Sequence, residues 1–288
     1  MPTLPAPRPA EPHQARQMAE SFGIDAERYD RTRPGYPLEL IERILAVSPG
    51  RDVLDVGCGT GIAARQFQAA GCRVLGVDVD ARMAEFARQR GLEVDVAKFE
   101  DWDPAGRGFD VVIAAQTWHW IDPAVGAAKA AEVLRPGGRI ALFRNDPRLP
   151  PRLVEAFGDV YDRVLPDLPL NPHRQSDPAS PATETLSEKA IRGLRQAGGF
   201  GAPQLWRFEW ERRYTRERWL DELPTSGLLT RLPQTALAEL LAAIGAAVDT
   251  TVNGSFTAHY TTLAVVAERV APSSSPGVLT GRDNQHVV

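Results

Sequence analysis

The sequence predicts a doubly wound α/β fold, in which a mostly parallel seven-stranded sheet has an antiparallel edge and a helical cap or insert. Three observations lead to this prediction. Short runs that are apolar on both faces alternate with segments of helical spacing, glycines end the early segments, and the alternation breaks down after residue 143. Strands buried on both faces and separated by one helix length are typical of a parallel sheet covered by helices on either side.

Five strands are expected in the first half of the chain, from apolar runs at 51–56, 73–77, 92–96, 110–115 and 139–143. Helical spacing predicts helices between them at 60–70, 81–90 and 123–134. Gly71 and Gly91 follow the first two helices, at positions where glycine favours a helix end. The turn Pro136-Gly137-Gly138 comes directly before the fifth strand.

The second half of the chain shows a different pattern. Pro-rich polar stretches at 145–151 and 165–183 flank a possible helix at 151–164, and we interpret residues 145–230 as a cap or insert carried on the sheet. Two further strands are expected at 204–214 and 255–268, with helices at 215–223 and 233–249, and these strands should pair antiparallel at the sheet edge. The domain is expected to cover 14–270, between disordered tails at 1–13 and 271–288.

Composition excludes several classes of protein. The 288 residues include 33 Lys and Arg against 37 Asp and Glu, a net charge of −4 that argues against a strongly basic nucleic-acid-binding surface. Apolar runs such as 240–248 are shorter than the roughly 20 residues of a membrane span. Cys58 and Cys72 lack metal or redox spacing, and the five His form no cluster, so no metal is expected. We expect a soluble cytoplasmic protein, monomeric or homodimeric, that binds neither nucleic acid nor a membrane.

The segment 53–61 carries the strongest functional signal. Gly57, Gly59 and Gly61 lie between a buried strand and a helix, where glycine lets the backbone turn sharply and approach a ligand closely. The free amides at the start of the helix also point at such a ligand. Asp78 ends the second strand, and its carboxylate can accept two hydrogen bonds from adjacent ribose hydroxyls. The pattern therefore predicts a nucleotide-containing cofactor.

Two cofactors fit this segment. Residues 59–64 match the G-x-G-x-x-A pattern of nicotinamide dinucleotide sites, and Asp78 lies 78 − 59 = 19 positions after Gly59. Against this interpretation, a dinucleotide fingerprint begins at the strand end, which Gly57 already occupies. Asp55 inside the strand is also unexpected beside a pyrophosphate, whereas it suits a ligand that carries a cation such as an ammonium group. A glycine turn without any ligand is the third interpretation.

The stretch Asp55-Val56-Gly57-Cys58-Gly59-Thr60-Gly61 resembles motif I of the class I S-adenosylmethionine-dependent methyltransferases. Residues 74–80 together with Met83 resemble the second motif of that family, and 134–139 its turn into the fifth strand. Segments 29–37, 99–102 and 116–120 are similar to small-molecule methyltransferases related to trans-aconitate methyltransferase. The resemblance spans 20–145 and extends less specifically to about 269. It implies a Rossmann-like methyltransferase fold and S-adenosyl-L-methionine as the cofactor.

The resemblance also implies how the cofactor is held. The glycines would lie against its methionine and ribose parts, Asp78 would hold the ribose hydroxyls, and Val79 with Met83 would flank the adenine. Phe99, with Glu100, would cover the other adenine face, and Gln116 is a candidate for the amino-acid end. The expected cofactor-binding residues are Asp55, Gly57, Cys58, Gly59, Gly61, Asp78, Val79, Met83, Phe99, Glu100 and Gln116.

The segment Gln116-Thr117-Trp118-His119-Trp120 follows the fourth strand, where the reacting groups are expected because ligands bind beyond the carboxyl ends of parallel strands. His119 is the candidate catalytic residue, as a general base, and the alternative is a histidine that positions the loop. If the loop is extended, Trp118 and Trp120 point to opposite sides. One of them would then wall the substrate pocket and the other would belong to the core.

Three more residues are candidates for substrate binding. Tyr29 and Arg33 lie in the segment 29–37, which by the resemblance covers the cofactor as a lid. Arg33 could pair with a carboxylate, and the alternative is a surface arginine stacked on Tyr36. Arg144 follows the fifth strand and is either a second carboxylate partner or an ordinary charge at a strand end. Together with Trp118 and Trp120 they form the expected substrate set.

The favoured function is an S-adenosylmethionine-dependent methyltransferase that moves a methyl group to an oxygen of a small organic acceptor, either a carboxylate or a hydroxyl. A carboxylate requires no base, whereas a protonated hydroxyl gives His119 a role. A nicotinamide-dependent oxidoreductase and a non-catalytic module that binds S-adenosylmethionine remain as alternatives. A macromolecular acceptor is disfavoured by the acidic charge balance.

Overall fold

The computed structural model describes residues 22–168, 171–174, 185–227 and 229–270, so the expected tails at 1–13 and 271–288 lie outside the described residues. A seven-stranded sheet has the order β3-β2-β1-β4-β5-β7-β6. The strands are β1 (Asp52–Val56), β2 (Arg73–Asp78), β3 (Glu93–Val96), β4 (Phe109–Ala115), β5 (Leu134–Arg148), β6 (Gln204–Thr215) and β7 (Ser255–Glu268). Strands β1 to β5 are parallel, and β7 runs antiparallel to both β5 and β6. The mostly parallel sheet with an antiparallel edge is confirmed.

Helices cover both faces of the sheet, as a doubly wound fold requires. On one face, α3 (Leu38–Ala46), α4 (Ile62–Ala69) and α5 (Ala81–Gln89) contribute buried side chains to one core cluster. On the other face, α6 (Pro123–Val133) and α8 (Leu186–Ala197) contribute to a second cluster. Asp80 and Asp122 cap α5 and α6 with side-chain oxygens, and such caps contribute about 1 kcal/mol each. These helices begin where the sequence supplies a cap.

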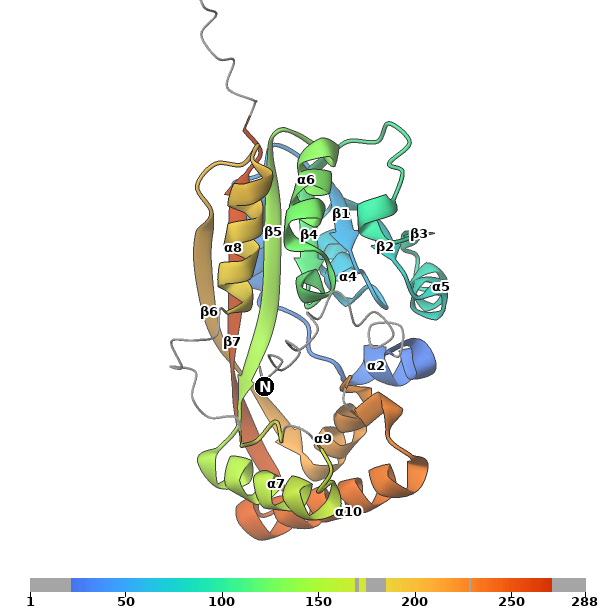
Figure 1. Ribbon diagram of the computed structural model, residues 1–288, viewed down its shortest axis with the longest axis vertical. Coiled ribbons are helices and arrows are strands. Elements are labelled where there is room, and N and C mark those ends of the chain that lie inside the picture. Colours follow the sequence, from blue (N-terminus) through green and yellow to red (C-terminus); the bar gives the residue numbers. More distant parts are fainter. Residues whose placement is uncertain (1–21, 169–170, 175–184, 228, 271–288) are drawn as a thin grey trace, which may run out of the picture.

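The strands β5, β6 and β7 are longer than the others and carry a cap at their far ends (Figure 1). Strand β4 pairs with β5 only as far as Phe143, and beyond that point β5 pairs with β7 alone. The cap consists of these strand ends with α7 (Pro151–Val164), α9 (Arg216–Glu222), α10 (Gln234–Val252) and the 3₁₀ turns η5 (Leu223–Thr225) and η6 (Leu229–Arg231). Its buried apolar side chains form a third core cluster, separate from the two against the sheet.

The expected boundaries of the cap, 145–230, are wrong on two counts. Helix α8 falls inside that range but packs on α6 over the sheet, where Ala190 and Leu194 are buried. Helix α10 falls outside the range, yet its Leu240 and Ile244 belong to the core of the cap. The expected range was inferred from proline-rich stretches, whereas the cap consists of the helices whose apolar faces pack against one another.

An N-terminal segment lies between the sheet and the cap, and the sequence did not predict its helices. It contains η2 (Phe22–Asp25), α2 (Ala26–Thr32) and an extended stretch at 33–37 that leads into α3. Figure 1 shows α2 between α5 and the cap. Residues 29–32 can be helical because Pro34 follows the end of the helix instead of interrupting it.

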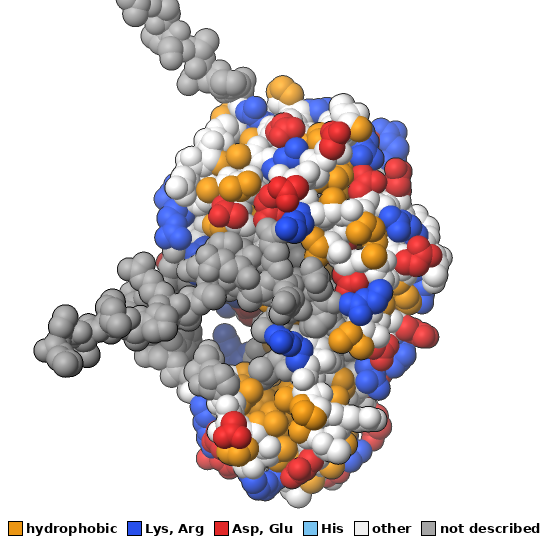
Figure 2. Space-filling model, turned by 45° about the vertical axis from the view of Figure 1, so that its right-hand side comes forward, with side chains coloured by type: hydrophobic (Ala, Val, Ile, Leu, Met, Phe, Trp, Pro, Cys, Tyr) orange, Lys and Arg blue, Asp and Glu red, His pale blue; other side chains and the backbone are white. Residues whose placement is uncertain are grey.

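The surface matches the acidic, mixed-charge composition. Figure 2 shows basic and acidic side chains interspersed over one face, with hydrophobic side chains gathered toward the end where the cap lies. Contrary to expectation, one helix among the described residues, α10, is long and apolar enough to cross a membrane by length and composition. Three of its side chains (Leu240, Ile244 and Val248) are buried in the cap, and Glu239 and Asp249 are exposed. Length and composition alone do not place it in a membrane.

Candidate active site

A cavity of about 430 Å³ lies beyond the carboxyl ends of β1, β2 and β4, between the sheet and the cap. Parallel α/β sheets bind ligands at this edge. Its lining comes from the glycine loop, the ends of β2 and β4, the N-terminal segment and the cap. Predicted site residues in the lining are Tyr29, Arg33, Gly57, Gly59, Asp78, Val79, Met83, Phe99, Glu100, Gln116, His119 and Trp120.

The glycine loop needs its glycines for different reasons. Gly57, Gly59 and Gly61 all have positive φ, of 65°, 54° and 84°. A Cβ at Gly57 would collide with the Thr117 side chain, and a Cβ at Gly61 would lie 3.2 Å from Leu92. At Gly59 a Cβ would meet nothing within 4 Å, and this residue lines the cavity. Gly59 therefore leaves open space where a ligand can reach the backbone, whereas Gly61 serves the start of α4 and lies outside the lining.

Asp78 joins the second strand to the glycine loop. Its Oδ2 accepts a hydrogen bond from the Gly59 amide at 2.7 Å, and its Oδ1 accepts one from the Asp80 amide at 2.8 Å. Burial raises the pKa of this carboxyl, although the backbone hydrogen bonds oppose the shift. Each carboxylate oxygen retains a further lone pair, so Asp78 can hold the loop and still accept hydrogen bonds from two hydroxyl groups of a ligand.

Asp55 does not line the cavity, although it is an expected cofactor residue. It is fully buried in β1. Neither carboxylate oxygen makes a hydrogen bond of normal geometry with a described residue, and the backbone amide of Ala64 nearby only opposes the rise in its pKa. Burial, reinforced by the charge of Asp78, raises the pKa of Asp55 to about 8. Cys58 also lies outside the lining, where its buried side chain packs against Gly76. An unpaired buried carboxyl is costly, and a cation in the adjoining cavity would favour its ionised form.

The turn after β4 is a 3₁₀ helix, η4 (Trp118–Trp120), so the condition of an extended loop is not met. Gln116 has a positive φ of 59°, which is strained for a residue other than glycine. Its amide nitrogen donates to the Phe143 carbonyl at 2.9 Å, and its Nε2 donates to the Asn145 carbonyl at 3.1 Å. These bonds to β5 hold the turn against the mouth of the cavity.

His119 lies at the centre of this turn. Its ring contacts that of Trp120 with 4.6 Å between the centroids, and no described residue hydrogen-bonds to its nitrogens. Burial, reinforced by the positive charge of Arg144, lowers the pKa of His119 to about 4. The imidazole is therefore neutral near pH 7 and carries a free lone pair, although it is a weaker base than an exposed histidine.

The two tryptophans of the turn point to different sides of it, although the turn is helical and not extended. Trp120 lines the cavity, whereas Trp118 is buried against Gly126 of α6. Trp118 and Arg144 face a second cavity of about 370 Å³, on the other side of η4 near α8. Arg144 is paired there with Asp146 at 2.9 Å. Two expected substrate residues, Trp118 and Arg144, thus lie outside the first cavity.

Tyr29 and Arg33 lie on the side of the cavity formed by the N-terminal segment. The guanidinium of Arg33 is 5.2 Å from the Tyr29 ring centre, so its aromatic partner is Tyr29 and not Tyr36 as in the alternative expectation. Its Nη2 donates to the Thr225 carbonyl of the cap at 2.7 Å. Arg33 therefore ties the N-terminal segment to the cap while lining the cavity.

The cap supplies lining residues that the sequence analysis missed. Glu222 and Tyr260 reach the cavity although they lie 38 positions apart in the sequence, on α9 and β7 (260 − 222 = 38). Asn145 also lines it, and strand alternation places Asn145 and Arg144 on opposite sides of β5. That alternation is the only sequence signal that could have favoured Asn145 over Arg144. No local motif marks Glu222 or Tyr260.

Comparisons with known proteins agree with this geometry. The family model described as "Methyltransferase domain" matches residues 53–138, which include the glycine loop, Asp78 and His119. An uncharacterized methyltransferase of Mycobacterium tuberculosis (strain ATCC 25618 / H37Rv) is 40% identical over 153 residues, which are 51% of this chain and 61% of that relative. The match thus spans less than two thirds of that relative's length.

Two further similarities cover a larger share of the protein that is matched. A demethylmenaquinone methyltransferase of Tropheryma whipplei (strain Twist) is 31% identical over 188 residues, which cover 60% of this chain and 75% of the relative. A solved structure described as a type II methyltransferase, from Anaeromyxobacter dehalogenans, is 26% identical with a TM-score of 0.59 and covers 83% of this chain and 98% of its own. The similarity therefore extends from the glycine loop through most of the fold.

Proposed function

Because this chain belongs to the class I S-adenosylmethionine-dependent methyltransferases, we propose that it moves a methyl group to an oxygen of a small organic acceptor. The observation that carries the proposal is that the glycine loop and Asp78 line the same cavity, of about 430 Å³, as polar side chains of the cap. A cofactor bound on the sheet side and a small acceptor bound on the cap side would therefore lie next to each other.

The residues present fit S-adenosylmethionine. Gly59 leaves open space at the cavity, and the Asp78 carboxylate is positioned to hold ribose hydroxyls. Val79, Met83 and Phe99 offer apolar contact for the adenine, as the family resemblance implies. The unpaired carboxyl of Asp55 lies beneath the cavity, where a positively charged ligand would offset its burial. When bound, the cofactor supplies an electrophilic methyl group.

The chain contributes mainly by orienting the acceptor, since well-aligned placement can supply roughly 7–11 kcal/mol of the barrier to group transfer. The strained turn at Gln116 fixes His119 in the cavity lining. We assign His119 as the group that accepts a hydrogen bond, and then the proton, from an acceptor hydroxyl. A neutral imidazole is required for that role, and the lowered pKa of His119 supports it near pH 7.

The experiment is an incubation of the purified protein with methyl-labelled S-adenosylmethionine and an extract of small metabolites, followed by mass spectrometry of labelled products. We expect labelled methyl ethers or esters of small compounds. Tight binding of S-adenosylmethionine without any labelled product would support a non-catalytic binding module instead. Labelled methylamines as the sole products would overturn transfer to oxygen.

Other expectations stay predictions that accompany this proposal. They include the trans-aconitate-like subtype, a cytoplasmic location, a monomer or homodimer, and the lack of nucleic-acid and membrane partners. The unpaired thiols of Cys58 and Cys72 suit a reducing compartment and so support the cytoplasmic location. The interspersed basic and acidic side chains on the face shown in Figure 2 support the lack of a nucleic-acid partner.

A further inference from the structure

The wall that the cap presents to the cavity is built from an enclosed chain of polar side chains. Glu222 and Tyr260 line the cavity, with only 7% and 3% of their surfaces exposed. Tyr214 and Arg212 lie behind them. We call Glu222 and Tyr260 the acceptor wall. Polar groups buried to this degree need defined partners, so the hydrogen bonds of the wall determine what it can offer a ligand.

The Tyr214 hydroxyl fixes the direction of these hydrogen bonds. It donates to Glu222 Oε2 at 2.9 Å, and it accepts from Arg212 Nη1 at 3.1 Å. A phenol has one proton to donate. When Glu222 is ionised, as its ion pair with Arg212 favours, the Tyr214 proton goes to Glu222, and the contact of 2.6 Å between the Tyr214 and Tyr260 hydroxyls uses the proton of Tyr260. Both Tyr214 lone pairs and its proton are then engaged.

Both residues of the acceptor wall consequently offer the cavity hydrogen-bond acceptors only. Tyr260 has given its proton to Tyr214, so its oxygen retains only lone pairs. Glu222 Oε2 is held by Arg212 at 3.1 Å and by Tyr214, whereas Oε1 has no hydrogen bond from the described residues. A ligand group that meets this wall must bring a proton to share.

Charge narrows the choice of ligand group. A carboxylate has no proton near neutral pH and would face the negative charge of Glu222. An ammonium group would join two cations already placed around that carboxylate, Arg212 in the bond just described and Arg33 in the cavity lining. Both arginines lower the pKa of Glu222 against the larger raising effect of burial. A neutral hydroxyl donates a hydrogen bond without adding charge.

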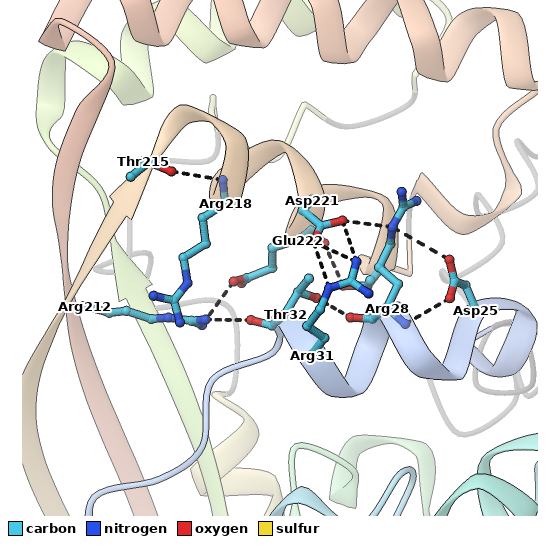
Figure 3. Close-up of polar contacts among 10 residues, drawn as sticks. Asp25, Arg28, Arg31, Thr32, Arg212, Thr215, Arg218, Asp221 and Glu222 are labelled. Atoms are coloured by element: carbon cyan, nitrogen blue, oxygen red, sulfur yellow. Dashed lines mark hydrogen bonds and ion pairs between the residues drawn. The ribbon is translucent and has the colours of Figure 1, made fainter.

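The wall is also held rigidly in place. Arg212 Nη2 donates to the Thr32 carbonyl at the end of α2, at 2.7 Å, as Figure 3 shows beside its contact with Glu222. The Thr225 hydroxyl donates to the Glu222 carbonyl at 2.6 Å. The Tyr260 ring stacks on Trp210 with 4.3 Å between the centroids. Preorganised acceptors of this kind discriminate well between ligands with and without a hydroxyl.

We propose that Glu222 and Tyr260 select a methyl acceptor that carries a hydroxyl besides the oxygen that is methylated, and that this second hydroxyl donates a hydrogen bond to Glu222 Oε1 or to the Tyr260 oxygen. This inference rests on the proposed methyl transfer and deepens it, because it favours diols, catechols or hydroxy acids over simple carboxylates. It makes Glu222 a specificity-determining residue of the acceptor side, separate from the cofactor residues on the sheet side.

The test compares wild type with three variants. Glu222→Gln keeps the shape of the side chain and can turn its amide group toward the cavity, which replaces an acceptor by a donor. Tyr260→Phe removes the second acceptor and keeps the ring. Asp221→Asn is the matched control, since Asp221 is the preceding residue of α9 and does not line the cavity. Each protein is assayed for binding of S-adenosylmethionine by calorimetry, for melting temperature, and for KM and kcat with acceptors found by labelled-methyl transfer to a metabolite extract.

We expect every acceptor of the wild type to carry a hydroxyl besides the oxygen that is methylated, and the analogue that lacks this hydroxyl to be a poor substrate. Glu222→Gln should raise the KM for the acceptor by roughly tenfold or more, the usual scale for a hydrogen bond to a charged group. Tyr260→Phe should raise it several-fold, and both should bind S-adenosylmethionine within twofold of wild type. Asp221→Asn should match wild type in cofactor binding and in the acceptor KM and kcat, with only a small change in melting temperature.

Two results would overturn the inference while leaving methyl transfer intact. One is a good wild-type acceptor that has no hydroxyl besides the oxygen that is methylated. The other is an unchanged acceptor KM in Glu222→Gln and Tyr260→Phe when both fold and bind the cofactor normally. A wild-type protein that does not bind S-adenosylmethionine at all would instead overturn the proposed function, and this inference with it.

Discussion

The two sides of the cavity are built in different ways. On the sheet side, Gly59, Asp78 and His119 each lie within a few residues of the end of a parallel strand. On the cap side, Arg33, Glu222 and Tyr260 come from three distant parts of the chain and meet only because the cap folds over the sheet edge. The sheet side is therefore a product of local sequence, and the cap side a product of long-range packing.

The two sides also differ in how their charged groups are satisfied. Among the described residues, Asp55 beneath the sheet side has no hydrogen bond of normal geometry, and Asp78 is held by backbone amides. Glu222 on the cap side is held by Arg212 and Tyr214, although Arg33 Nε has no partner among these residues. The carboxyl group of the sheet side is thus left for a ligand to pair with, whereas the carboxyl group of the cap side is paired within the protein. Five substitutions test this contrast, in order of decreasing expected effect.

Asp55→Asn should give the largest change, in the stability of the ligand-free protein. The pKa of Asp55 is about 8 in the folded state against 3.8 for an unperturbed aspartate, so the folded state keeps a proton that the unfolded state loses as pH rises from 4 to 8. The stability of wild type should fall through this window relative to Asp55→Asn, by on the order of 2 kcal/mol or more at pH 8. Urea unfolding at pH 5 and pH 8 measures the difference.

Asp110→Asn is the control for that experiment. The Asp110 carboxylate is also buried, but it accepts hydrogen bonds from the Asp52 amide at 3.0 Å and from Arg135 at 2.8 Å. Its replacement should destabilise the protein, since it leaves both donors with a weaker partner. If Asp55→Asn and Asp110→Asn destabilise the protein equally at pH 8, the contrast between buried carboxyl groups with and without hydrogen-bond partners is wrong.

Asp78→Ala should weaken the binding of S-adenosylmethionine by about 2 kcal/mol or more, because two charge-assisted hydrogen bonds to the ligand are lost together with those from the Gly59 and Asp80 amides. Asp95→Ala is the comparison on the neighbouring strand. Asp95 accepts from Trp102 at 2.9 Å and from Arg107 at 2.7 Å, outside the cavity lining. Calorimetry should show a changed dissociation constant for the first variant alone, and equal constants would remove Asp78 from the cofactor site.

His119→Ala should lower kcat for hydroxyl acceptors by roughly 10²-fold, the lower end of the range for a proton acceptor, with little change in cofactor binding. Because the pKa of His119 is lowered to about 4, the wild-type rate should show no inflection from this group near pH 6.5. A pH–rate profile from pH 4.5 to 8 checks this expectation. A loss of activity centred near pH 6.5 that disappears in the variant would show an unperturbed histidine instead.

Gly59→Ala and its control Gly106→Ala test whether a ligand occupies the open space next to Gly59. Both residues have positive φ, 54° and 77°, and a Cβ at either would meet nothing within 4 Å. Each substitution should cost about 1 kcal/mol of stability through backbone strain. Only Gly59 lines the cavity, so only its variant should also lose affinity for S-adenosylmethionine, by several-fold or more. Equal affinity in the two variants would mean that no ligand approaches Gly59.

The smallest effect is expected from Asp221→Asn at the junction of the cap with α2. Asp221 pairs with Arg28 at 3.1 Å and with Arg31 at 2.8 Å, and all three side chains are at least one-third exposed (Figure 3). Pairs of this kind contribute up to about 1 kcal/mol and are screened by salt. Thermal unfolding at low and high ionic strength should show a small difference that vanishes with salt. A loss that persists in high salt would indicate that the cap depends on this junction.

Most of the sheet could be predicted because its strands are buried on both faces and therefore have a strong apolar signature. The expected strand 110–115 is observed as Phe109–Ala115, and the expected helix 151–164 is Pro151–Val164. The fifth strand, expected at 139–143, extends over Leu134–Arg148 because β7 pairs with it beyond the end of β4. That extension depends on a partner more than a hundred residues away.

The placement of the candidate site residues follows the same division. Gly59 and Asp78 line the cavity, and a turn and a strand end mark them locally in the sequence. For Arg144 the structure favours the alternative of a charge at a strand end, because its neighbour Asn145 faces the cavity and only the packing of β5 between two layers decides which of them does. Trp118, Cys58 and Gly61 carry local motif signals but serve the core or the helix start.

By itself, the sequence determined the parallel sheet, the glycine loop and the aspartate that closes the second strand, because these depend on residues close together in the chain. The tertiary structure decided which helices form the cap, that the N-terminal segment joins cap to sheet, and that Glu222 and Tyr260 share a cavity with the cofactor residues. Contacts between distant segments are set by which apolar faces and polar groups find partners on folding, and no local pattern encodes them.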